Sequence, residues 1–217
     1  MKTGNHQMTK GEEIANSVTH GIGAALSVSA LTLLIITAFQ NGDAADITGA
    51  MIFGISMLFL YLMSTLCHAF AKTGGMVRKV FHILDHSGVY ILIAGTYTPF
   101  CLTMIGGTKG YVILAIQWSL AILGIILRSA FYNKYIPLHV VIYLAMGWMI
   151  GFFIKSIYPL VAPAGLALLL AGGICYTIGV LFYAFKLFKY HHMVWHLCVI
   201  GGTVCHFLMI YLYVLPR

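Results

Sequence analysis

Charged residues are scarce in this chain: they make up 8% of its 217 residues, and only five of them are acidic. Hydrophobic residues make up 61% and occur in long blocks rather than at amphipathic spacing. Such blocks are typical of membrane helices. The net charge of +7 would suit nucleic acid in a soluble protein, but here the basic residues lie in short segments between apolar blocks. The composition predicts an all-α integral membrane protein with no nucleic-acid partner.

The chain also lacks a paired-cysteine motif. Its cysteines are odd in number, form no C-x-x-C pair and lie inside apolar blocks, so we expect them to pack rather than to form disulfides or a thiolate metal site. The polar start MKTGNHQMTKGEE precedes the first apolar block, which begins near His20, and this argues against a cleavable signal peptide. The five cysteines are Cys67, Cys101, Cys175, Cys198 and Cys205.

Seven apolar segments are long enough to span a bilayer, which takes about 20 residues. We expect residues 1–19 to form a cytoplasmic N-terminal segment and the whole chain, 1–217, to form a single seven-helix membrane domain. The predicted spans are 20–40, 49–70, 82–105, 110–128, 136–156, 160–185 and 193–215.

The basic residues between these spans predict the orientation, because cytoplasmic loops carry an excess of Lys and Arg. A cytoplasmic N-terminus puts nine of them inside and three outside, and seven spans then place the C-terminus outside. Asp43 and Asp46 fall in an outside loop. The inside set is Lys2, Lys10, Lys72, Arg78, Lys79, Arg128, Lys134, Lys186 and Lys189; the outside set is Lys109, Lys155 and Arg217.

Asp85 is the one acid that lies inside an apolar block, in VFHILDHSGVYILIAGTYTPF. An ionisable group within a span usually has a partner and is a functional candidate. The alternative is an interfacial acid at a helix start, which the helix dipole would favour.

Three histidines lie at the same predicted membrane face as Asp85. His68 closes the second span, and His192 and His196, four residues apart, share one face at the start of the seventh. H-x-x-x-H alone is a weak pattern, and a single histidine at a span end is usually an interfacial residue. Together the three imidazoles would leave a fourth coordination position for water, the arrangement of a catalytic zinc site. The sequence therefore predicts zinc bound by His68, His192 and His196.

Two further residues are catalytic candidates at this site. Asp85 could orient the water or accept its proton. Ser64, four residues before His68 and on the same helical face, could hydrogen-bond a ligand or a substrate oxygen. The alternative for Ser64 is a hydroxyl bonded to its own helix backbone.

Other polar residues support weaker predictions. Glu12, Asn16 and His20 share one face before the first span, where they would either cover the mouth of the site or form the wet face of a juxtamembrane helix. GTYTP at 95–99 predicts a kink or local cavity with a structural role. Histidines 82 and 86 flank Asp85, and one of them could be in the outer shell; 191 points away from the site, 206 lies roughly 15 Å deeper, and 139 has no obvious partner.

The motifs together resemble the hemolysin III branch of the progestin and adipoQ receptor family. They are S-x-x-x-H at 64–68, Asp85 followed by GTYTP, and H-x-x-x-H at 192–196; E-x-x-x-N-x-x-x-H at 12–20 also fits. The resemblance covers nearly the whole chain. It implies seven helices, a cytoplasmic N-terminus and an intramembrane zinc site in which Asp85 approaches the ion through water. The short termini resemble a bacterial member, which implies the bacterial plasma membrane.

Four functions are alternatives. The family is related to alkaline ceramidases, so the resemblance implies a zinc-dependent hydrolase of a lipid amide or ester, with a membrane lipid as substrate. The second alternative is a non-catalytic membrane sensor or homeostasis protein with structural zinc. A pore-forming cytolysin fits poorly, because a secreted toxin must be soluble before insertion. A channel fits poorly too, because the span centres carry no ring of charges.

Overall fold

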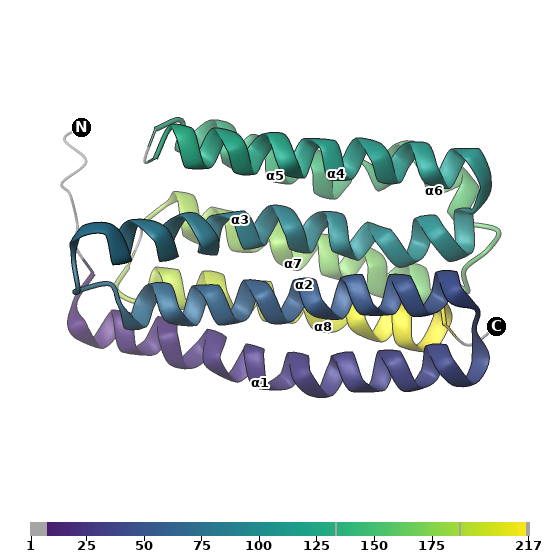
Figure 1. Ribbon diagram of the computed structural model, residues 1–217, viewed down its shortest axis with the longest axis horizontal. Coiled ribbons are helices and arrows are strands. Elements are labelled where there is room, and N and C mark those ends of the chain that lie inside the picture. The colour runs from purple at the N-terminus through teal and green to yellow at the C-terminus, as the bar shows by residue number, and fades with distance from the viewer. Residues whose placement is uncertain (1–7, 133, 187, 216–217) are drawn as a thin grey trace.

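The computed structural model describes residues 8–132, 134–186 and 188–215, and within these ranges every regular element is a helix. Seven helical segments are long and apolar enough to cross a membrane, as the sequence predicts. They run alternately up and down the long axis of the molecule (Figure 1). The elements are α1 (Lys10–Asn41), α2 (Ala44–Ala69), α3 (Gly75–Pro99), η1 (Phe100–Ile105), α4 (Gly107–Ala130), α5 (Ile136–Trp148), α6 (Ile150–Ile157), α7 (Pro163–Ala184) and α8 (His191–Tyr213).

Capping interactions set the start of the first two helices. Thr9 and Glu12 form a capping box, in which each side chain accepts a hydrogen bond from the other residue's backbone N–H. As a result α1 begins at Lys10, ten residues before the predicted first span. Asp43 and Asp46 form a second capping box. These two acids therefore cap α2 rather than lying free in a loop.

Two of the spans are interrupted. Pro99 has no N–H to donate, and the helix widens after it into the π-helical turn η1. The fifth span breaks at Met149, between α5 and α6. The Tyr97 hydroxyl bridges this break, because it donates to the Gly147 carbonyl at 2.9 Å and accepts the Ile150 N–H at 2.8 Å. The GTYTP segment thus supports a neighbouring helix.

The helices pack in a closed order around the molecule. α2 lies between α1 and α3, α3 contacts α4 and α5, α5 contacts α7, and α7 contacts α8, which returns to α1. The outer surface is apolar: Phe152 is 88% exposed, and Phe39 is 66% exposed. Polar side chains such as Gln117 lie inside. An apolar outside around a partly polar inside is the arrangement that a bilayer requires.

The basic residues gather mainly at one end of the bundle. Arg128 is an exception to the predicted loop set: α4 continues to Ala130, and the Arg128 side chain turns inward and is fully buried. Lys2 and Arg217 lie outside the described residues. The start of α1 and the end of α8 lie at opposite ends of the bundle (Figure 1).

Candidate metal centre

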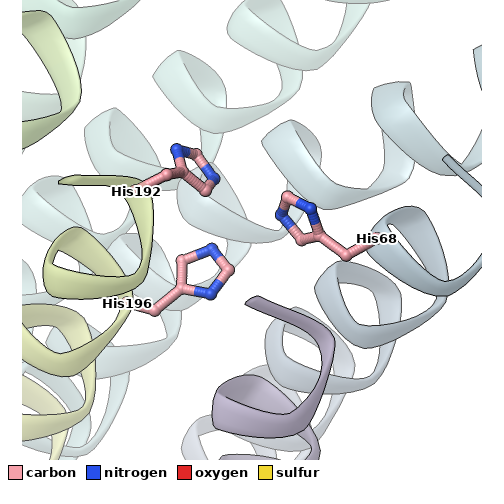
Figure 2. Close-up of side chains that lie close together, drawn as sticks. All are labelled: His68, His192 and His196. Carbon is pink, nitrogen blue, oxygen red and sulfur yellow. The ribbon is translucent and has the colours of Figure 1, made fainter. Parts of the chain in front are cut away.

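His68, His192 and His196 meet at the end of the bundle where α1 begins. One possible ligand atom from each lies within 4.8 Å of the other two. The ring centroids are separated by 5.1 Å for His68–His192, 5.0 Å for His68–His196 and 4.7 Å for His192–His196. Figure 2 shows the two imidazoles from α8 facing the one from α2. His192 and His196 are four residues apart and so lie on one face of α8, and His68 approaches them from the last turn of α2. The three rings form a nearly equilateral triangle.

Hydrogen bonds leave a particular nitrogen free on two of the rings. His68 Nδ1 lies 2.7 Å from Glu13 Oε2, and His196 Nδ1 donates to the Asn16 carbonyl at 3.2 Å. In each ring Nε2 then holds the lone pair. His68 Nε2 is buried and has no hydrogen-bond partner among the described residues. An imidazole fixed by a carboxylate or carbonyl on one nitrogen and open on the other is the usual state of a metal ligand.

The donor set therefore fits a zinc ion. Zinc takes imidazole nitrogens at about 2.0–2.1 Å, and three such ligands leave one position for water in a tetrahedral site. A buried imidazole nitrogen without a partner costs free energy, which a bound cation would offset. Glu13 supplies the carboxylate that commonly orients a ligating histidine.

The first half of α1 holds the start of α8. Glu12 Oε1 accepts the Tyr190 N–H at 3.1 Å, one residue before α8 begins. The His20 ring stacks on His196 with centroids 3.5 Å apart and planes 10° apart. The Asn16 carbonyl adds the hydrogen bond to His196. The predicted Glu12–Asn16–His20 face is therefore buried against the start of α8, and it is not the wet face of a juxtamembrane helix.

Asp85 and Ser64 both line the cavity beside the histidines. Asp85 lies ten residues after the start of α3, about 15 Å along its axis, so the alternative of an acid at the helix start is wrong. Its Oδ2 lies 3.8 Å from His86 Nδ1. Ser64 Oγ is fully buried and has no hydrogen-bond partner among the described residues. The backbone bond considered for Ser64 is therefore not formed.

Arg128, a predicted loop cation, contacts one of the histidines that flank Asp85. Arg128 Nη2 donates to His82 Nδ1 at 3.1 Å. His86 Nδ1 donates to the His82 carbonyl at 3.0 Å, and the Tyr183 hydroxyl lies 3.3 Å from His86 Nε2. These contacts link α3, α4 and α7 at the level of the cluster, and they fix the two histidines that flank Asp85.

The three remaining histidines of the described residues are held elsewhere. The Tyr90 hydroxyl lies 2.7 Å from His139 Nδ1, a partner that the sequence analysis did not find. His191 Nδ1 donates to the Phe182 carbonyl at 2.9 Å, away from the triangle. His206 donates to the Leu169 carbonyl at 3.1 Å. None of the three joins the cluster.

A cavity of about 130 Å³ adjoins the cluster and extends into the bundle. His20, Ser64, Asp85, His192 and His196 line one end of it. The wall beyond them is largely apolar, and it is formed by side chains of α2, α3, α5, α7 and α8. One end of the cavity is therefore polar and adjoins the histidine cluster, whereas the rest is apolar. Such a cavity suits an amphiphilic ligand.

Fold and site define a class: a seven-helix membrane protein with a histidine cluster buried at one end. The chain matches the family described as haemolysin-III related over residues 8–207, and it belongs to that family. It is 46% identical to hemolysin-3 of Bacillus cereus over 205 residues, which cover 94% of this chain and 93% of that protein. The hemolysin-3 homolog of Bacillus subtilis strain 168 is also 46% identical, over 93% of this chain and 94% of that protein.

A more distant relative confirms the wider resemblance. The human monocyte to macrophage differentiation factor is 28% identical over 215 residues, which cover 97% of this chain and 87% of that protein. The similarity runs through the whole membrane domain rather than through one motif. The hemolysin III branch predicted from the three motifs is therefore confirmed.

Proposed function

We propose that this protein is a zinc-dependent hydrolase that cleaves an amide or ester bond of a membrane lipid in a bacterial plasma membrane. The observation that carries the proposal is the unpaired, buried Nε2 of His68 within the histidine triangle, whose other two members, His192 and His196, line the largely apolar cavity together with Asp85. A structural zinc site is usually closed by a fourth protein ligand. A triangle of three histidines that opens onto a cavity favours the catalytic alternative.

The distribution of charge supports an orientation with this site near the cytoplasm. Among the described residues, seven exposed cations lie in segments at the cluster's end of the bundle, and two lie at the other end, together with the Asp43–Asp46 cap. Cytoplasmic segments are enriched in Lys and Arg. The seven are Lys10, Lys72, Arg78, Lys79, Lys134, Lys186 and Lys189; the two are Lys109 and Lys155.

The chain's own residues divide the work of hydrolysis. Zinc, when bound, supplies a Lewis acid and lowers the pKa of a coordinated water toward about 7. Asp85 accepts the proton that water loses as its oxygen bonds to the acyl carbon, and returns it to the leaving nitrogen or oxygen as the scissile bond breaks. The Ser64 hydroxyl, which makes no hydrogen bond to its own helix backbone, donates to the developing oxyanion. Glu13 and Asn16 keep the ligand rings oriented.

The test is the release of fatty acid from defined lipids. The zinc-loaded protein in nanodiscs is incubated with a ceramide and with a phospholipid, and free fatty acid is quantified by mass spectrometry. We expect release from one class, and a fall of about 10²–10⁴-fold in Asp85→Asn. Asp46→Asn, at a buried acid on the opposite end, is the matched control. No release from either lipid by the zinc-loaded wild type would favour the sensor with structural zinc.

A further inference from the structure

The far end of the main cavity contains a polar residue that the proposed hydrolysis does not use. His206 lines the cavity that begins at His196. The two residues are ten positions apart on α8, which corresponds to about 15 Å along the helix. A second cavity of about 40 Å³ is also lined by His206, so this side chain stands where the two spaces adjoin.

Apart from Ser64 at the histidine end, the hydroxyl groups that line the cavity already have hydrogen-bond partners within the protein. Each of them directs its hydrogen to a backbone carbonyl or to a neighbouring side chain, so the wall beyond Ser64 offers no free hydroxyl hydrogen to a ligand. The pairs are Thr96–Leu92 O, Tyr97–Gly147 O, Tyr143–His86 O, Tyr176–Thr203 Oγ1, Thr177–Gly173 O and Tyr183–His86 Nε2.

His206 differs from these groups because it retains an unused acceptor. Its Nε2–H donates to the Leu169 carbonyl at 3.1 Å, so Nδ1 carries the lone pair of the neutral ring. The side chain is 8% exposed, and Nδ1 has no partner among the described residues. A buried acceptor in this state lowers the stability of the fold unless a donor reaches it.

Packing holds the His206 ring in place. A Cβ on Gly172 would overlap its Cδ2 and Nε2 atoms, so the ring fits against α7 only because residue 172 is glycine. Tyr176 packs on it edge to face, with ring centroids 5.4 Å apart. The ring, with its unpaired Nδ1, is therefore held at a fixed depth beside the cavity.

We propose that His206 forms a hydroxyl-binding subsite, in which Nδ1 accepts a hydrogen bond from a hydroxyl group partway along a lipid acyl chain. The position of the chain rests on the proposed function, which places its carbonyl at the histidine triangle. An extended chain advances about 1.2 Å per bond, so a group about 12 carbons from the carbonyl reaches the depth of His206. The smaller cavity receives the end of the chain beyond it.

The chemistry of the subsite makes it selective for a donor. A hydroxyl satisfies Nδ1, whereas an unsubstituted methylene leaves it unpaired. A keto group at the same carbon adds only another acceptor and leaves it unpaired as well. The preferred ligand is therefore a mid-chain hydroxylated acyl lipid rather than any long chain of sufficient polarity.

The experiment measures equilibrium binding of four free fatty acids to the full-length protein in nanodiscs, without turnover. They are stearic acid, stearic acid hydroxylated at about its twelfth carbon, the keto acid of the same position, and stearic acid hydroxylated beside the carboxyl group. We expect the mid-chain hydroxy acid to bind about fivefold more tightly than the other three, the gain of one buried hydrogen bond. The keto acid controls for partition into the bilayer, because its polarity is similar.

His206→Phe keeps a ring of similar size and removes the acceptor, so the fivefold preference should disappear in this variant. His139→Phe makes the same exchange at a buried histidine that does not line the cavity, and it should keep the preference. Equal binding of the hydroxy and keto acids by the wild type would overturn the proposal, and so would a preference that survives in His206→Phe or the binding of none of the acids. A preference without any hydrolysis would leave the subsite standing and refute the hydrolase.

Discussion

His68 Nδ1 and Glu13 Oε2 lie 2.7 Å apart, although 55 residues separate them in the chain. The contact joins the last turn of α2 to the first turn of α1, and the opposite ring nitrogen of His68 has no hydrogen-bond partner among the described residues. A carboxylate in this position raises the basicity of a ligating imidazole and fixes its orientation. Glu13 therefore belongs to the candidate metal centre as the partner that orients the His68 ring.

Replacing Glu13 should weaken metal binding without removing a ligand. We expect Glu13→Gln to raise the dissociation constant for zinc by about tenfold, the lower end of the effect of such partners, because the amide still accepts a hydrogen bond but carries no charge. Competition with a chromogenic chelator measures the constant. Asp46→Asn, at the far end of the bundle, should leave it unchanged. Equal affinity of Glu13→Gln and the wild type would show that the contact does not support a metal ligand.

Metal content distinguishes ligands from neighbours. The purified wild type should contain about one zinc per chain, since three imidazoles with an open position suit that ion. His192→Ala/His196→Ala should lose it, whereas His191→Ala should keep it, because His191 donates to the Phe182 carbonyl. Asp85→Asn should also keep it. Elemental mass spectrometry gives the stoichiometry, and retention of zinc by the double variant would refute the assigned ligands.

Close packing between α3 and α4 provides a test of the fold. A Cβ on Gly124 would overlap the ring of Tyr90, which is fully buried and cannot move aside cheaply. We expect Gly124→Ala to destabilise the protein by about 1–3 kcal/mol, the usual cost of overpacking. Gly151→Ala meets nothing within 4 Å and should be neutral or stabilising. Thermal unfolding in detergent compares the two, and similar midpoints would contradict this packing.

The seven helices could be predicted because each depends on local composition alone. The meeting of His68 with the two histidines of α8 could be predicted as well, because alternating helices bring the end of the second and the start of the seventh to one face. The role of Glu13 was not predicted, because the E-x-x-x-N-x-x-x-H spacing lies on the helical face that starts at Glu12. Glu13 and Ser17 are four residues apart and therefore share another helical face, which was an available signal in the sequence. In the structure this face contacts α2, where Ser17 donates to the Thr65 carbonyl.

Other features depend on partners far apart in the chain. Arg128 looks like a loop cation in the sequence, and only the approach of α3 shows that its guanidinium turns inward to His82. The break at Met149 coincides with no proline, and it is bridged by Tyr97 from another helix. The depth of Asp85 depends on where α3 starts, and the apolar block gave no sign of the turns between Gly75 and residue 82. Such pairings require tertiary packing that periodicity does not encode.

Chemical labelling of single residues tests the proposed orientation. Lys109→Cys, in the first turn of α4, should react with a membrane-impermeant maleimide on intact cells, because the proposed orientation places the end of the bundle away from the histidines outside the cell. Lys79→Cys, at the opposite end, should react only after the cells are permeabilised. Both positions are exposed. The wild type is the control, since its five cysteines lie within the helical spans and should stay unlabelled. The opposite pattern would place the histidine cluster at the outer face, and a cytoplasmic site would then be wrong.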